Sequence, residues 1–77
     1  MKASEVHGLE DPQLVELVGE SRRQVFNLRL QHSIGQLENT ARLKHAKRDL
    51  ARALTVAGER GIDVESELRR QRDEQRS

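Results

Sequence analysis

Residues Asn39 to Ala57 read NTARLKHAKRDLARALTVA and carry the most regular pattern in this chain. Apolar side chains recur there at spacings of three and four residues, so they share one side of an α-helix that turns about 100° per residue. They are Leu43, Ala46, Leu50, Ala53, Leu54 and Ala57. The pattern predicts a helix over about 40–58 whose apolar face packs against a partner helix.

The opposite side of this predicted helix is basic. Lys44, Arg48 and Arg52 recur at spacings of four residues, with Arg42 and Lys47 beside them. Residues 39–60 hold six Lys or Arg and two Asp or Glu, although the whole chain has a net charge of only +1. This concentration of positive charge predicts a local binding surface for a polyanion. A solvated helix face without a ligand has the same pattern, so charge alone leaves both interpretations open.

A second amphipathic stretch comes before this one. Asp11 and Pro12 predict a helix start, because aspartate can accept hydrogen bonds from the first backbone N–H groups and proline is tolerated in the first turn. The helix is expected over about 12–33. Its stripe consists of Leu14, Leu17, Val18, Ser21, Val25, Leu28 and His32.

The loop predicted over 34–39 is short. In it, Gly35 can adopt the left-handed conformation that ends a helix, and Asn39 can cap the next one. Two long helices with so short a connection fold back on each other, with their apolar stripes in contact. The predicted fold class is therefore all-α, a long antiparallel two-helix hairpin.

Two further segments flank the hairpin. Lys2 to His7 predicts a short N-terminal helical turn, with Val6 and Leu9 available for docking. Residues 63–77 are a mixed-charge run whose apolar residues are Val64 and Leu68, and we expect a charged, solvated C-terminal extension. The predicted division is a hairpin domain over 1–60 and an extension over 61–77.

Phe26 and Leu30 do not fit the buried stripe. At about 100° per residue they project about 120° to 160° from Leu14, close to the opposite side of their helix. One interpretation is that the N-terminal turn covers them. The other is that they dock on another protein or on RNA.

The composition argues against several functional classes. The chain has 77 residues, one aromatic residue and no cysteine, so it can form only a thin core and no thiolate metal site. His7, His32 and His45 lack the spacing of metal ligands, and no motif of an active site or phosphate loop is present. We expect no enzyme activity, catalytic residue, metal, cofactor or small-molecule substrate. The lack of an apolar run of about 20 residues, or of a signal-peptide pattern, favours a cytoplasmic location without a membrane partner.

The order of several motifs along the chain carries a resemblance. Phe26-Asn27-Leu28-Arg29-Leu30-Gln31 is followed by Gly35-Gln36-Leu37, then by Asn39-Thr40 and by Leu43-Lys44-x-Ala46-Lys47-Arg48-Asp49-Leu50-Ala51-Arg52. With the opening Met1 to Glu5, this succession resembles the bacterial large-subunit ribosomal protein twenty-nine family over residues 1 to about 60. The charged tail is longer than in many members.

The resemblance implies a non-catalytic helical hairpin on the large ribosomal subunit, beside the mouth of the polypeptide exit tunnel. The implied partners are large-subunit ribosomal RNA and neighbouring ribosomal proteins at the rim of that tunnel. Arg42, Lys44, Lys47, Arg48 and Arg52 would then bind phosphate groups, and Gln36 and Asn39 at the hairpin tip would bond RNA backbone or 2′-hydroxyl groups.

Two rival classes remain open at this point. Exposed Phe26 and Leu30 are also compatible with a helical module that self-associates into a four-helix bundle. A membrane-surface hairpin is disfavoured, because the chain has no tryptophan and few bulky apolar residues.

Overall fold

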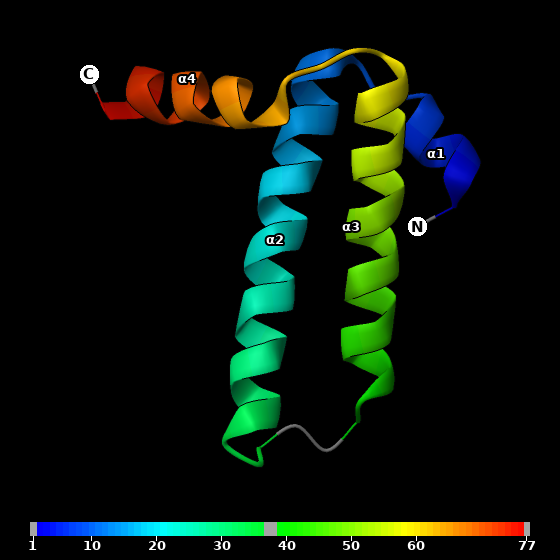
Figure 1. Cartoon of the computed structure of the whole chain (residues 1–77), viewed down its shortest axis with the longest axis vertical. Coiled ribbons are helices and arrows are strands. Elements are labelled where there is room, and N and C mark those ends of the chain that lie inside the picture. The colour runs from blue at the N-terminus through cyan, green and yellow to red at the C-terminus, as the bar shows by residue number, and fades with distance from the viewer. Residues whose placement is uncertain (1, 37–38, 77) are drawn as a thin grey trace.

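The computed structural model describes residues 2–36 and 39–76, and these form four α-helices and no strand. In chain order, the helices are α1 (Ala3–His7), α2 (Asp11–Ser33), α3 (Ala41–Glu59) and α4 (Val64–Arg76). α2 and α3 lie side by side in opposite directions, as Figure 1 shows. The predicted all-α hairpin is therefore confirmed.

The two short helices flank the open end of the hairpin, away from the α2–α3 connection. α1 packs against α3, and α4 packs against α2 and projects sideways from it (Figure 1). The molecule is flat, with extents of 36 × 33 × 15 Å. Both long helices consequently keep uncovered outer faces in the half nearer the hairpin tip.

The two long helices end in the same way. Gly35 follows α2 and Gly61 follows α3, with φ angles of 75° and 70° that favour glycine. In each case the next residue closes the helix end: the Gln36 N–H donates to the Gln31 carbonyl at 2.8 Å, and the Ile62 N–H donates to the Ala57 carbonyl at 3.0 Å. The predicted role of Gly35 is confirmed, and the chain uses the same device again before α4.

The helix starts agree with the prediction in one case and differ in the other. Thr40 is the N-cap of α3, and Asn39 before it accepts a hydrogen bond from the Ala41 N–H through Oδ1 at 3.0 Å, so Asn39 satisfies a backbone N–H of the first turn as predicted. Asp11 is not the cap of α2: it is the first helical residue, and the Glu10 N–H before it donates to Gln13 Oε1 at 3.0 Å. Leu37 and Glu38, in the middle of the predicted loop, lie outside the described residues.

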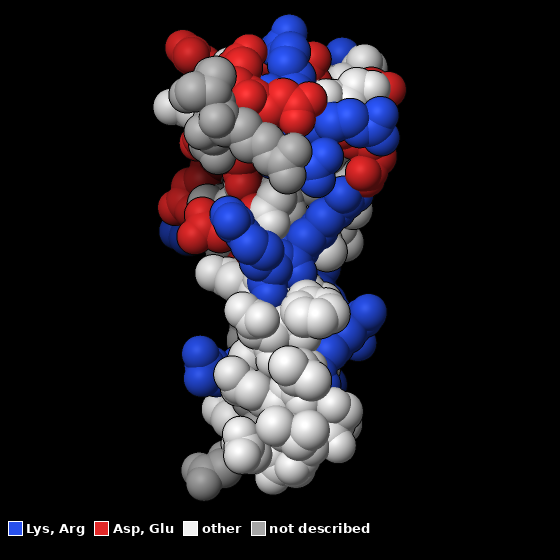
Figure 2. All heavy atoms as spheres, turned by 90° about the vertical axis from the view of Figure 1, so that its left-hand side faces the viewer, with Lys and Arg blue, Asp and Glu red and all other residues white. Residues whose placement is uncertain are grey.

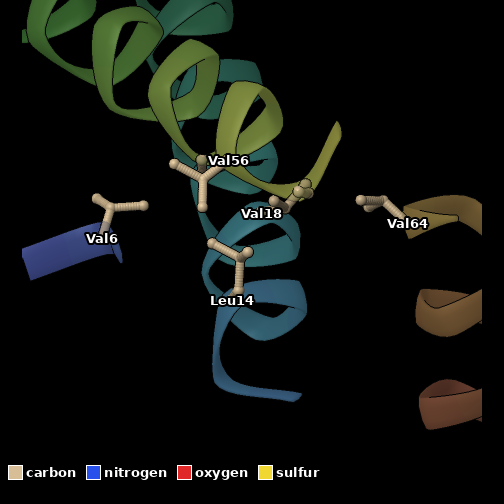
Figure 3. Close-up of a cluster of buried hydrophobic side chains, with 7 residues drawn as sticks. Val6, Leu14, Val18, Val56 and Val64 are labelled. Carbon is tan, nitrogen blue, oxygen red and sulfur yellow. The ribbon is translucent and has the colours of Figure 1, made fainter. Parts of the chain in front are cut away.

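One buried apolar cluster joins all four helices at the open end. We call it the junction cluster, and its buried members are Val6, Leu14, Val18, Ala53, Val56, Ala57 and Val64. In Figure 3, Val6 from α1 and Val64 from α4 approach Leu14, Val18 and Val56 from opposite sides. Alanines on α3 let the helices come close, because the distance between packed helices depends on the side chains at their contact.

A smaller cluster continues the hairpin core toward the tip. Val25, Leu28 and Ala46 are buried there, and Leu50 packs against both clusters. The predicted stripes are confirmed for most of their members, but Leu54 is 37% exposed and His32 is exposed. Val56, which lies outside the predicted stripe, is buried because α3 packs against α1 as well as against α2.

Arg60, which follows α3, bonds to the segment 7–11 between α1 and the start of α2. Its guanidinium donates to the carbonyls of His7 at 2.8 Å and Leu9 at 2.7 Å, and pairs with Asp11 Oδ1 at 3.1 Å. The first two acceptors lie at and just beyond the end of α1, where unpaired carbonyls favour a cation. Asp11 therefore contributes to an ion pair between α2 and the residue that follows α3.

The C-terminal extension is not solvated along its whole length, and in this the prediction was wrong. Val64 is buried, and Leu68 of α4 packs on Gly19 of α2, where an added Cβ would lie 2.9 Å from Leu68 Cδ2. Glu65 pairs with Arg22 of α2 at 2.5 Å. Because Gly19 has no side chain, Leu68 can pack directly on α2, a contact that the composition of α4 alone does not indicate.

Asp63 caps the start of α4. It accepts bonds from the Ser66 N–H at 3.3 Å and the Ser66 hydroxyl at 2.9 Å. These bonds hold the pKa of Asp63 below its ordinary 3.8, and the hydrogen bond from Arg22 holds the pKa of Glu65 below its ordinary 4.5. Both carboxylates therefore stabilise docked α4 in their ionised form.

Replacing Arg60 by methionine should loosen α1. Methionine keeps an apolar stem but removes three hydrogen bonds, so we expect the free energy of unfolding to fall by about 1–3 kcal/mol in denaturant titrations. Arg70→Met is the matched control, because Arg70 is exposed and pairs with Glu67 of its own helix. A loss for Arg60→Met no larger than for the control would contradict the role given to Arg60.

Docking of α4 should weaken in acid. Both carboxylates have lowered pKa values in the folded state. Their stabilisation of docked α4 is therefore complete above their ordinary pKa values, and it is lost as the pH falls through the lower pKa values of the folded state. Titrating the Ser66 amide and Leu68 methyl signals by NMR should show release below about pH 4. The Asp63→Asn, Glu65→Gln double variant should remove most of this pH dependence, and the same acid transition in that variant would contradict the assignment.

Candidate nucleic-acid interface

We call the predicted cationic residues of α3 the basic ridge: Arg42, Lys44, Lys47, Arg48 and Arg52. The first four are exposed and Arg52 is half-buried. Lys44, Arg48 and Arg52 follow one another at one-turn spacing and so extend over roughly 12 Å at 1.5 Å per residue. At about 100° per residue, Lys44 and Arg48 lie opposite buried Ala46 and Ala53 and so face outward, with Lys47 and Arg52 on either side of them. Arg42, in the first turn of α3, lies instead within about 40° of Ala46 and Ala53.

Within the ridge, Lys44 and Arg48 differ from Arg52 in their surroundings. Both are exposed, whereas Arg52 is partly covered and already takes part in an interaction. A guanidinium that is held in place loses less freedom when it binds a phosphate, while an exposed lysine binds mainly by charge. Lys44 and Arg48 are therefore the residues on which charge reversal tests the ridge most cleanly.

Gln36 and Asn39, the residues predicted to bind at the tip, flank the connection between the long helices. The Gln36 backbone closes α2, and its side chain is exposed. Asn39 already uses Oδ1 to cap α3, so its remaining polar group is the side-chain NH₂, which donates hydrogen bonds. Asn39 is thus suited to phosphate, hydroxyl or carbonyl acceptors on a ligand.

Phe26 and Leu30 form an apolar surface on α2 together with Ile34. We call these three residues the apolar stripe; they follow one another at one-turn spacing and are 67%, 52% and 58% exposed. The interpretation in which the N-terminal turn covers Phe26 is wrong, because Val6 is buried in the junction cluster instead. Ile34, predicted as part of the loop, is the C-cap of α2 and lengthens the surface by one turn.

The apolar stripe and the basic ridge lie on opposite sides of the hairpin. Phe26 points away from the face of α2 that packs on α3, and Arg48 points away from the face of α3 that packs on α2. In Figure 2, which views the α2 side, a band of Lys and Arg crosses the middle, and the half toward the tip shows a broad uncharged region with Lys or Arg at both edges. The two surfaces are therefore exposed on different sides of the hairpin.

A further group of cations was missed at the sequence level. Arg22 and Arg23 of α2 and Arg69 and Arg72 of α4 line a groove between these two helices. The group exists only because α4 docks on Gly19. A glycine on the outward face of an amphipathic helix, one to two turns before Phe26, was the available signal for a close contact.

Other kinds of site receive no support from the described residues. No group of three His, Asp or Glu within 2–36 and 39–76 is arranged to hold a metal ion. Among these same residues, no helix is sufficiently long and apolar to cross a bilayer.

Comparison with known proteins identifies the family. The family model described as ribosomal L29 protein matches residues 4–60. A large ribosomal subunit protein uL29 from Maridesulfovibrio salexigens is 48% identical over 62 residues, which is 80% of this chain and 97% of that protein. The protein of the same name from Acholeplasma laidlawii is 44% identical over 61 residues, covering 79% and 98% of the two chains.

A relative from Streptomyces griseus, also named large ribosomal subunit protein uL29, is 43% identical over 65 residues, or 84% of this chain and 88% of its own. No solved structure matched. The family match confirms both the resemblance seen in the motifs and the prediction of a non-enzymatic protein. This chain belongs to the ribosomal L29 protein family.

Proposed function

We propose that the chain is a structural constituent of the large ribosomal subunit in the cytoplasm and that it binds large-subunit ribosomal RNA through the basic ridge. This proposal depends on two observations taken together, the family match and the exposure of cationic side chains on α3. A ribosomal protein family matches residues 4–60, and within that range α3 turns exposed Lys44, Lys47 and Arg48 away from the core.

The chemistry of the ridge suits a phosphate backbone better than individual bases. Lysine and arginine neutralise phosphates, and arginine can also donate two parallel hydrogen bonds to one phosphate group. Phe26 is the single Phe, Tyr or Trp residue of the chain and lies on the other helix, so none of these rings is available at the ridge for stacking on bases. Gln36 and Asn39 would add hydrogen bonds where RNA passes the hairpin tip.

The second surface supports contact with protein neighbours. A ribosomal protein that binds RNA along α3 leaves its α2 side available, and there Phe26, Leu30 and Ile34 are more than half exposed. An aromatic residue beside branched aliphatic ones is typical of the centre of a protein interface. We propose that this apolar stripe docks on a neighbouring ribosomal protein at the rim of the exit tunnel, as the family resemblance implies.

The apolar stripe also favours a second candidate, the self-associating helical module. That function predicts a dimer in sedimentation that is insensitive to salt and that Phe26→Asp dissociates. Ribosomal RNA binding through the basic ridge predicts instead a chain whose affinity for RNA falls steeply with salt and is unaffected by Phe26→Asp.

Reversing charge at the basic ridge tests the proposed function. Lys44→Glu with Arg48→Glu should reduce incorporation into large subunits in high-salt gradients. With purified ribosomal RNA, the slope of log affinity against log salt should become shallower by about 0.7–0.9 for each phosphate that the variant no longer neutralises. Circular dichroism should show unchanged helicity, because both side chains are exposed.

The matched control is Lys2→Glu with Arg70→Glu, which changes the net charge equally at exposed positions away from the ridge. It should leave incorporation close to that of the natural chain. Equal loss in both double variants would indicate an effect of net charge alone, and unchanged incorporation of the ridge variant would contradict RNA binding at α3.

A further inference from the structure

We propose that α4 and α2 together form a second phosphate-binding surface, the arginine groove, which contacts ribosomal RNA on the side of the hairpin opposite the basic ridge. We define the groove by Arg22, Arg23, Arg69 and Arg72. This inference rests on the proposed function and extends it to a helix outside the family match, which ends at residue 60, before α4 begins at Val64.

The first support for the proposal is that α4 is held in one orientation. Leu68 sits on Gly19, Val64 enters the junction cluster and Asp63 caps the helix, so the contact combines apolar burial with fixed hydrogen bonds. The pair between Glu65 and Arg22 then fixes which side of α4 faces the tip half of α2. A helix that was merely tethered would not present a defined face.

The second support is the sorting of charge around α4. At about 100° per residue, Arg69 and Arg72 lie within about 40° of Glu65 and therefore share the face that meets α2. Asp73 and Glu74 lie with Ser66 and Arg70 around a separate hollow on α4, which Arg69 also borders from the edge of the groove. α4 is thus basic toward α2 and more acidic away from it.

The third support is the electrostatic balance of the groove. Glu65 offsets Arg22, which leaves Arg23, Arg69 and Arg72 as its cations. Glu16 and Glu20 also line this hollow, and they precede Arg23 on α2 by about two turns and by just under one turn. The positive charge is therefore concentrated toward Phe26, in agreement with the blue band above the uncharged region in Figure 2.

Phosphate groups of RNA are the ligand that this chemistry fits. Three guanidinium groups on two crossing helices can donate paired hydrogen bonds to successive phosphates, and a surface of this kind binds by charge and shape. An RNA segment in the groove would lie beside the apolar stripe. The RNA contact and the proposed protein contact would then be adjacent on the α2 side.

Salt-dependent binding of the full-length chain to protein-free large-subunit ribosomal RNA tests the groove. Arg23→Gln and Arg72→Gln should each make the slope of log affinity against log salt shallower by about 0.7–0.9. Arg70→Gln removes the same charge from the same helix outside the groove, and it should leave the slope unchanged. Arg72→Lys, which retains the charge, should restore most of the slope.

The two levels of the proposal fail in different ways. If Arg72→Gln, Arg70→Gln and the natural chain had equal slopes of log affinity against log salt, RNA binding at the groove would be contradicted. A shallower slope for Lys44→Gln with Arg48→Gln would in that case still support RNA binding at the basic ridge. If the ridge variant also bound normally, the proposed function would fall too. The Leu68 methyl signals, recorded for each variant by NMR, should remain those of docked α4, so that a shallower slope is attributable to the removed guanidinium.

Discussion

The structure depends on apolar contact among four helices at one end of a hairpin. Val6, Leu14, Val18, Ala53 and Val64 come from α1, α2, α3 and α4, and all five are buried in one cluster. A chain of 77 residues has few apolar side chains. Burying apolar surface stabilises the fold by about 25 cal/mol per Å², and this gain must offset the conformational entropy lost when every helix is ordered. Concentrating the contacts in the junction cluster makes one small core serve all four elements.

This economy has a functional consequence. Because the core lies at the open end and narrows to Val25, Leu28 and Ala46 toward the tip, the outer faces of both long helices stay uncovered there. One face carries Lys44 and Arg48, and the other carries Phe26 and Leu30. On the function proposed above, contacts on both sides would complete this thin hairpin, with polyanion binding on one and apolar burial on the other.

Much of this fold can be predicted from the sequence because its signals are local. Helical periodicity, the left-handed Gly35 and the bond of Asn39 to the first turn of α3 depend on residues close in the chain, and all three are confirmed. The features that were missed depend on contacts between distant segments. Arg60 reaches carbonyls more than fifty positions earlier, and Val56 is buried by α1.

The candidate site divides in the same way. The exposure of the basic ridge follows from the period of α3, since residues opposite a buried stripe must face outward. The arginine groove could not be read from periodicity, because it forms only when Leu68 meets Gly19 across about fifty residues of intervening chain. A mixed-charge run such as 63–77 gives no indication of which of its faces will be covered.

Amide hydrogen exchange on the full-length chain tests the central claim most directly. If the junction cluster holds the four helices together, the slowest amides should lie near Leu14 and Val18 on α2 and near Ala53 and Ala57 on α3, with faster exchange toward the tip. Slowest exchange around Leu28 and Ala46, or protection of α2 that is independent of α3, would contradict it.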